Sequence, residues 1–266
     1  MSARRWCGGA RLAEAAGFDG ADIKCCHRYL NSELLSAYER KGRYGGSFEG
    51  RTRLLREAVA GAIASCGKDF LVTSRLNVYD GFPYPYGFGV KPDGSTEPDL
   101  TEPSRLAGEL SRLGVRLLNI TMGNPYFNPH VNRPYSRGGY EPPEHPLVGV
   151  ERMLNGTAEI RRAVPAVKLI GSAFSYLGVA APHVAAGCIR AGGMDFAGFG
   201  RTVFAYPDFA SDLLKNGAMD PKKCCLCCSK CTEIMRQKGG TPGCVLRDGE
   251  IYLPIYRTLC CQKGEM

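Results

Sequence analysis

The chain alternates between segments with the pattern of β-strands and segments with the pattern of α-helices, and this alternation constrains its fold more than any other feature. Strands are expected where short apolar and β-branched runs stand between turn residues, and helices where apolar residues recur at helical spacing. The expected strands cover residues 18–26, 70–78, 115–121, 167–171 and 195–200. The expected helices cover residues 2–16, 48–66, 102–113, 148–163, 179–191 and 206–216. Such alternation predicts a parallel sheet with right-handed helical crossovers.

Two architectures of this class compete: an open doubly wound sheet and a (β/α)8, or TIM, barrel. Polar residues gather just after the expected strands, where both architectures bind ligands. No G-x-G-x-x-G follows the first strand, which weakens the dinucleotide-binding open sheet. A barrel closes with eight strands, whereas about five strand–helix units are found here, so the strand count is the main anomaly of the barrel interpretation.

The bulk composition favours an ordinary cytoplasmic protein. No apolar run among the 266 residues approaches the roughly 20 that a membrane helix needs, and the N-terminus lacks the apolar core of a signal peptide. The net charge of +8 is spread along the chain without a long basic run, so neither nucleic acid nor a membrane is expected as a partner.

Thirteen cysteines are many for such a protein, and four of them form a motif near the C-terminus. Cys225, Cys228, Cys231 and Cys244 have the spacing C-x2-C-x2-C-x12-C. In a reducing compartment, clustered cysteines more often bind metal than form disulfides. Four thiolates suit either a zinc ion or an iron–sulfur cluster, and the spacing alone leaves both open.

Two groups of side chains near strand ends are candidates for chemistry. Lys24 and His27 follow the first strand and can donate hydrogen bonds to one oxygen, which would polarise a carbonyl or stabilise an oxyanion. The alternative is a surface lysine beside a structurally satisfied histidine. Arg75 lies inside an otherwise apolar strand, so as a buried cation it needs an anionic partner: a cofactor that gains negative charge, or a neighbouring carboxylate.

The last two strands are followed by small residues that suit a phosphate site. Gly171 and Ser172 follow one strand, and Gly200 and Arg201 follow the other. Small residues let backbone N–H groups approach a phosphate, and an arginine adds a fork of donors. Each motif alone is equally explained by an ordinary tight turn. The long loop at residues 123–134 is polar and aromatic and is interpreted as an active-site rim.

Taken together, these segments resemble the old yellow enzyme-like NADH:flavin oxidoreductases. The closer similarity is to their iron–sulfur branch, which includes trimethylamine dehydrogenase and 2,4-dienoyl-CoA reductase. The resemblance covers essentially the whole chain. Its motifs lie at residues 16–30, 43–51 and 198–208 and in the cysteine segment.

The resemblance implies a TIM barrel that binds FMN at its carboxyl face. It places Arg75 against the flavin, Gly171, Ser172, Gly200 and Arg201 around the phosphate, and His27 in the substrate-binding pair. Lys24 stands where relatives carry His or Tyr. A four-iron, four-sulfide cluster would be held by Cys225, Cys228, Cys231 and Cys244, in preference to the overlapping register of Cys224, Cys227 and Cys231.

The resemblance also implies an activity and an anomaly. Electrons would pass from NAD(P)H, directly or through a partner flavoprotein, by way of the cluster to FMN, and then to the activated C=C bond of a small unsaturated carbonyl compound. Oxidation of an amine or a C–H bond is the alternative within the family. Family members begin with three more strands, so we expect an incomplete barrel over 1–218, an iron–sulfur segment over 219–266, and low FMN affinity unless a missing N-terminal half is supplied as a partner.

Two further interpretations come from other classes. One is a zinc-binding, non-catalytic module, and the other is an inactive remnant that does not fold alone. A homo-oligomer is left open by the sequence.

Overall fold

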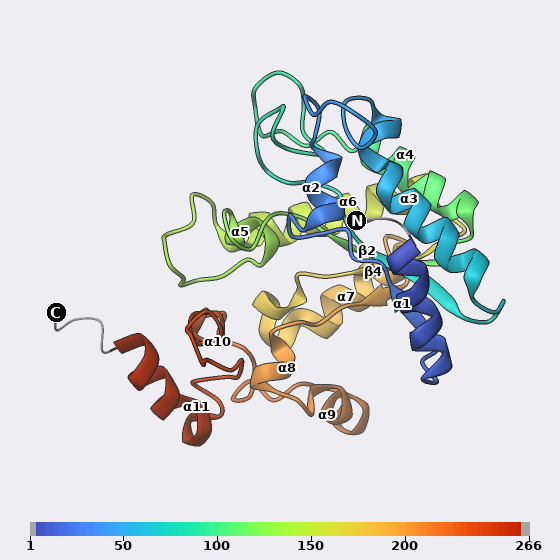
Figure 1. Cartoon of the computed structure of the whole chain (residues 1–266). Coiled ribbons are helices and arrows are strands. Elements are labelled where there is room, and N and C mark those ends of the chain that lie inside the picture. The colour runs from blue at the N-terminus through green and yellow to red at the C-terminus, as the bar shows by residue number, and fades with distance from the viewer. Residues whose placement is uncertain (1–3, 262–266) are drawn as a thin grey trace. The chain divides into compact units, whose positions relative to one another are not determined.

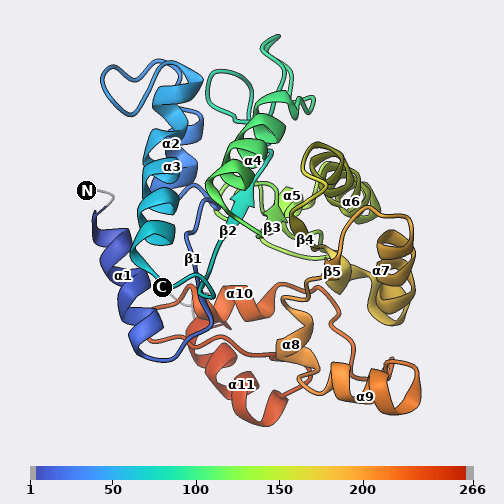
Figure 2. The ribbon, with the colours of Figure 1, turned by 90° about the vertical axis from the view of Figure 1, so that its right-hand side faces the viewer.

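The computed structural model describes residues 4–261, and its central feature is a parallel sheet of five strands. The strands are β1 (Gly20–Asp22), β2 (Leu71–Asn77), β3 (Leu117–Thr121), β4 (Lys168–Gly171) and β5 (Phe196–Ala197). They lie side by side in sequence order, β1-β2-β3-β4-β5, and every neighbouring pair is parallel (Figure 2). Sequential parallel pairing is the strand order of a (β/α)8 barrel, so the expected α/β class with about five strand–helix units is confirmed.

Helices connect the strands as expected. They are α1 (Arg4–Ala15), α3 (Phe48–Ser65), α4 (Thr101–Leu113), α6 (Pro146–Ala163) and α7 (Ala181–Arg190). Local signals set their ends: Ser47 caps α3 by accepting a hydrogen bond from the Gly50 N–H at 3.2 Å, and α4 stops at Gly114, whose φ of 109° favours glycine. Helices α1, α3 and α4 run side by side along the sheet (Figures 1 and 2).

Burial alternates along the strands and separates the two faces of the sheet. Leu76, Leu118, Ile120 and Leu169 are fully buried and form the core with the helices. The residues between them, among them Thr73, Arg75, Asn119 and Ile170, are only half-buried. Because Arg75 pairs with Asn119, and Asn119 with Ile170, these side chains form one row across the second face. That row carries the polar residues of the candidate site.

Truncation of one core side chain gives a test of this packing. Leu118→Ala is expected to lower the free energy of unfolding by about 2–5 kcal/mol, because the removed side chain is fully buried and leaves a cavity. Leu12→Ala is the matched control, since Leu12 is 73% exposed, and should change stability little. Denaturant unfolding measures both, and equal effects would contradict the assigned core.

Tertiary contacts divide the chain into two compact units. The sheet belongs to the first, which comprises the residues up to 132 together with 151–172 and 188–197. The second comprises 133–150, 173–187 and the residues from 198 onward. This division differs from the expected limits of 1–218 and 219–266, which remain a prediction about function.

Some elements differ from expectation. The helix expected at 206–216 begins later, as α9 (Phe209–Asn216), and a short helix that was not expected, α8 (Thr202–Ala205), precedes it; Pro207, which has no N–H to continue a helix, lies between the two. The short segments not expected are α2 (Leu30–Leu35), α5 (Pro129–Asn132), the 3-10 helix η1 (Phe174–Ala180), α10 (Lys230–Met235), α11 (Gly249–Tyr256) and the π-helix η2 (Arg257–Cys261). Within residues 4–261, no helix is long and apolar enough to span a membrane.

Candidate functional site

The first candidate site begins where the chain leaves β1. Pairing with β2 continues past β1, because the Cys25 N–H donates to the Arg75 carbonyl at 3.0 Å and the Asn77 N–H to the Cys25 carbonyl at 2.8 Å. The chain then turns sharply: His27 has a φ of 62° and Arg28 a φ of 56°. Left-handed backbone is uncommon for residues other than glycine, and strained residues of this kind cluster at functional sites.

His27 is held in a setting that keeps its imidazole neutral. Its Nε2 atom is buried and has no hydrogen-bond partner among residues 4–261. Burial, together with the charges of Arg75 and Lys24, lowers the pKa of His27 to about 4. A neutral imidazole offers one donor and one acceptor. The unsatisfied Nε2 atom favours a binding role over that of a structurally satisfied histidine, and this role stays a prediction.

Lys24 lies at the same edge of the sheet and is held by an aromatic ring. Its Nζ atom is 3.4 Å from the centroid of the Tyr29 ring, and its carbonyl accepts from the Asn31 side chain at 3.0 Å. Tyr29 in turn shares a hydrogen bond of 2.8 Å between its hydroxyl and that of Tyr126. The ammonium group is thus held by a cation–π contact, which is worth only about 0.5–1 kcal/mol on a surface.

Arg75 and Asn119 form the polar centre of the half-buried row. The Nε atom of Arg75 and the Oδ1 atom of Asn119 are both buried and both lack a hydrogen-bond partner. Arg75 is half-buried on the face of the sheet opposite the core, and its Nε atom is buried, so its expected role as a cation that needs an anionic partner stays a prediction. Asp22 accepts from the backbone N–H of Arg75 at 3.1 Å rather than from its guanidinium. An unsatisfied donor and an unsatisfied acceptor thus stand next to each other on β2 and β3.

The loop at 123–134 contributes an aromatic border in its first part. Tyr126 and Phe127 are 63% and 71% exposed, and Phe127 packs edge-on against Phe82 with ring centroids 4.9 Å apart. The Asn124 N–H donates to the Asn128 side chain at 2.7 Å, which holds the loop in shape. Exposed aromatic side chains beside polar groups are typical of binding loops, in keeping with the expected rim.

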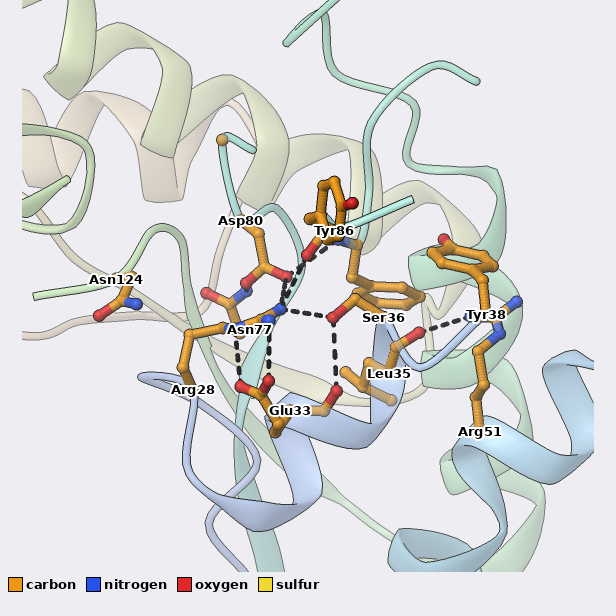
Figure 3. Close-up of polar contacts among 12 residues, drawn as sticks. Arg28, Glu33, Leu35, Ser36, Tyr38, Arg51, Asn77, Asp80, Tyr86 and Asn124 are labelled. Carbon is orange, nitrogen blue, oxygen red and sulfur yellow. Dashed lines mark hydrogen bonds and ion pairs between the residues drawn. The ribbon is translucent and has the colours of Figure 1, made fainter. Parts of the chain in front are cut away.

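Sequence reasoning missed the residues that hold these loops together. Arg28 forms an ion pair of 2.9 Å with Asp80, whose side chain is 1% exposed (Figure 3). Burial raises the pKa of Asp80 to about 6, although Arg28 and the Phe88 N–H act in the opposite direction. The available signal was a carboxylate placed three residues after the buried strand β2, at its carboxyl end.

The expected phosphate positions fall in different units. Gly171 and Ser172 belong to the first unit. A Cβ atom on Gly171 would lie 2.6 Å from the flexible end of the Met194 side chain, which would have to shift, and the Ser172 hydroxyl donates weakly to the Ile120 carbonyl at 3.4 Å. Gly200 and Arg201 belong to the second unit, and their joint role with the first pair stays a prediction.

Arg201 makes its side-chain hydrogen bond within the second unit. Its Nη2 atom donates to the Pro134 carbonyl at 3.0 Å, whereas its Nη1 atom is buried without a hydrogen-bond partner. A Cβ atom on Gly200 would meet no atom within 4 Å, so packing within the structure does not require that glycine. Both observations leave space and a donor for an anionic group.

The second candidate site is a cavity lined by cysteines. Cys225, Cys228, Cys231 and Cys244 all line it, together with Cys227 and Arg201. Cys224 does not; it packs with Tyr206 and Met219, and its thiol donates to the Asp220 carbonyl at 3.4 Å. The structure therefore brings together all four residues of the preferred register and leaves out the first residue of the overlapping one.

Backbone N–H groups and arginine face the thiols. The Cys227 N–H donates to the Cys225 sulfur and the Arg247 N–H to the Cys244 sulfur, each at 3.4 Å. The sulfurs of Cys225 and Cys227 share a hydrogen bond in which either can be the donor, and this contact lowers the pKa of Cys227 to about 7 and raises that of Cys225. Burial raises the pKa of Cys231, and the charge of Arg201 opposes that rise. The amide N–H groups and the charge of Arg201 favour thiolates, whereas burial and the contact between Cys225 and Cys227 keep Cys225 and Cys231 protonated in the chain without a bound cluster.

The thiols share a cavity without forming a preassembled ion site. Within residues 4–261, no three His, Cys, Asp or Glu side chains are grouped closely enough to hold one metal ion. Tetrahedral zinc would require sulfur–sulfur separations of about 3.8 Å, from Zn–S bonds of about 2.3 Å. The sulfurs of Cys225 and Cys227 are 4.0 Å apart.

Comparisons with known proteins agree with this parallel α/β fold. Residues 3–86 match the NADH:flavin oxidoreductase / NADH oxidase family. An NADPH dehydrogenase from Bacillus licheniformis is 51% identical over 53 residues, which cover 19% of this chain and 16% of the relative. A metal reductase from Desulforamulus reducens is 24% identical over 233 residues, which cover 86% of this chain and 30% of the relative. A solved 2-naphthoyl-CoA reductase complex has a TM-score of 0.65 at 20% identity, over 85% of this chain and 30% of that chain.

The parallel sheet in sequential order is the arrangement of a barrel-type α/β fold. Within this class, the matches confirm the resemblance to the NADH:flavin oxidoreductases, and residues 3–86 carry the family match. The matched parts amount to less than a third of each of the three relatives.

Proposed function

We propose that this chain is the part of an NAD(P)H-linked flavin oxidoreductase that binds FMN and a four-iron, four-sulfide cluster, and that the enzyme reduces an activated C=C bond. One observation carries the proposal. Three buried polar atoms without partners, His27 Nε2, Arg75 Nε and Asn119 Oδ1, stand at or beyond three neighbouring strands of the sheet. Buried polar atoms are rarely left unpaired, so a bound group is the expected partner.

The residues of the half-buried row fit a flavin. The edge of the flavin ring carries both N–H and carbonyl groups, and Arg75 Nε and Asn119 Oδ1 provide the complementary donor and acceptor. The guanidinium of Arg75 would stabilise negative charge on that edge. Gly171, Ser172, Gly200 and Arg201 are the proposed phosphate contacts. When bound, FMN would supply hydride transfer.

Lys24 and His27 are the proposed substrate-binding pair. The neutral His27 can donate one hydrogen bond to a carbonyl oxygen, and Lys24 can leave the Tyr29 ring to donate a second at small cost. Both donors would hold the oxygen on which negative charge develops during reduction of the conjugated bond. The site is cationic, so a small unsaturated carbonyl or carboxylate compound is the proposed substrate class.

The cysteine cavity fits an iron–sulfur cluster through its donor set. Cys225, Cys228, Cys231 and Cys244 provide four thiols, and the N–H groups of Cys227 and Arg247 donate to two of them. Amide hydrogen bonds to ligand sulfurs and a nearby arginine tune the potential of such centres. When bound, the cluster would supply electron transfer between the reductant and the flavin.

Turnover of substrate-pair variants tests the proposed chemistry. After anaerobic reconstitution with FMN, iron and sulfide, His27→Gln is expected to lower kcat/KM for reduction of 2-cyclohexenone by about 10²–10³-fold, the usual cost of one lost oxyanion donor. Lys24→Met should have an effect of the same direction. His183→Gln, which alters an exposed histidine, is the control and should leave kcat/KM unchanged.

Two results would contradict the proposal. The first is a reconstituted chain that turns over the enone equally well in both site variants. The second is a chain that holds one equivalent of zinc, excludes iron after anaerobic preparation, and shows no flavin-dependent turnover, which would support the zinc-binding module instead.

A further inference from the structure

The turn after β1 contains two consecutive left-handed residues, neither of which is glycine. His27 and Arg28 have φ angles of 62° and 56°. A glycine would adopt this backbone without steric cost, whereas a residue with a Cβ atom adopts it only where surrounding contacts hold it there. The side chain of Arg28 makes contacts that can hold this backbone.

All three nitrogen atoms of the Arg28 guanidinium make hydrogen bonds or ion pairs. Its Nη1 atom donates to the Ser36 hydroxyl, to Asp80 Oδ2 at 2.9 Å and to the Tyr86 carbonyl at 3.1 Å (Figure 3). Its Nε and Nη2 atoms contact the Glu33 carboxylate at 2.9 and 3.1 Å. Because planar guanidinium forks bind with fixed geometry, these bonds fix the backbone from which the side chain projects.

Asp80 anchors the other end of this contact. Its Oδ1 atom accepts from the Asn77 side chain at 2.8 Å, and its Oδ2 atom also accepts from the Phe88 N–H at 2.9 Å. The Asn128 side chain donates to the Asp80 carbonyl at 2.8 Å. Asp80 thus joins the end of β2 to the loop that follows β2 and to the loop that follows β3.

We propose that Arg28 and Asp80 are positioning residues, which hold the strained turn in place so that the imidazole of His27 stays buried at the carboxyl edge of the sheet. The proposal rests on the proposed function, because it gives His27 the substrate-binding role assigned there. Neither residue touches the reacting atoms; both act through the backbone at His27. The role of the side chain at position 28 explains why an arginine, and not a glycine, occupies a left-handed position.

The test measures the environment of His27 directly and needs no bound flavin. Arg28→Gly removes the fork but permits the same backbone. In the native chain the pKa of His27 is about 4. Lys24 and Arg75, the charged groups that act on His27 from its own turn and from β2, remain in the variant. Release of the turn should expose the imidazole and raise its pKa to about 6 or above, near the ordinary value.

The imidazole signals of the chain's four histidines are followed by NMR over pH, and His27→Gln assigns the signal of His27. Arg43→Gly is the matched control, because Arg43 lies in a loop, pairs with Glu57 at 2.6 Å and is 64% exposed. The control should leave the His27 titration unchanged. A His27 titration unchanged in folded Arg28→Gly would overturn the proposal.

A second variant covers the case in which Arg28→Gly does not fold because Asp80 is left buried without its cation. The double variant Arg28→Gly with Asp80→Asn removes that charge, and Asn77 Oδ1, which is buried without a partner, can accept from the new amide after the Asn77 side chain turns over. The double variant should fold and still show the raised His27 pKa. Failure of both variants to fold would mean that the pair supports the whole fold, and would also overturn the proposal.

Activity separates this inference from the proposed function. If the site reduces enones, Arg28→Lys, which keeps the charge but not the fork, should lower kcat/KM less than His27→Gln does. If no enone is reduced by the native chain, the proposed function fails, while the NMR titration still decides whether Arg28 and Asp80 position His27.

Discussion

Replacement of Cys228 by serine is expected to abolish incorporation of the iron–sulfur cluster. Cys225, Cys231 and Cys244 line the same cavity and should give the same result when each is replaced by serine. Loss of one thiolate removes a covalent ligand to the cluster. After anaerobic reconstitution, iron and acid-labile sulfide should fall from about four per chain to a small fraction of that, and the visible absorbance of the cluster should be lost.

Cys224→Ser is the matched control, because the two cysteine registers differ at this residue. Cys224 packs with Tyr206 and Met219 outside the cavity, so its replacement should leave the iron content unchanged. If Cys224→Ser and Cys227→Ser abolish the cluster while Cys225→Ser and Cys228→Ser retain it, the overlapping register is correct and the preferred one is wrong.

Replacement of Asp80 by asparagine is expected to change how the free energy of unfolding depends on pH. Asp80 has its pKa raised from 3.8 to about 6 by burial. A raised carboxyl pKa adds stability that is fully present below about pH 4 and is lost as the pH rises through 6. The shift corresponds to about 3 kcal/mol. His27 acts in the opposite sense: its pKa is lowered from 6.5 to about 4, so its contribution is present above pH 6.5 and is lost as the pH falls through 4.

In the native chain the pH-dependent contributions of Asp80 and His27 to the free energy of unfolding largely offset each other between pH 4 and 6. Asp80→Asn removes the contribution of Asp80. The free energy of unfolding of the variant, relative to that of the native chain, should therefore rise by about 2–3 kcal/mol between pH 4 and pH 6. Denaturant unfolding at pH 4, 5, 6 and 7 measures the difference. Asp93→Asn, at an exposed carboxylate, is the control. A constant difference between variant and native chain across this range would show that Asp80 does not titrate there.

The strand–helix pattern was predictable because it depends on local residue patterning. Residues 70–78 contain apolar and β-branched side chains between turns, and β2 forms there. The break at Pro207 had a local signal as well, since proline interrupts a helix. The six-residue helix α2 had no local sequence signal, because so short a helix is held by tertiary contacts rather than by its own residue pattern.

The site residues that the sequence could indicate follow an expected strand or, like Arg75, interrupt the apolar pattern within one. His27 and Lys24 were found from their position after β1. The Arg28–Asp80 pair joins residues 52 positions apart and has no local pattern. The strained φ of Arg28 is likewise a product of that distant contact, since an arginine in isolation gives no indication of left-handed backbone.

The bonds of Asp80 also limit how this chain can be redesigned. Loops at the carboxyl end of a barrel sheet are often exchanged one at a time to change specificity. Here the loops after β1, β2 and β3 share one carboxylate residue as an anchor, through Arg28, Phe88 and Asn128. Replacement of one loop alone would leave Asp80 without one of these hydrogen bonds. The three loops should therefore be exchanged together.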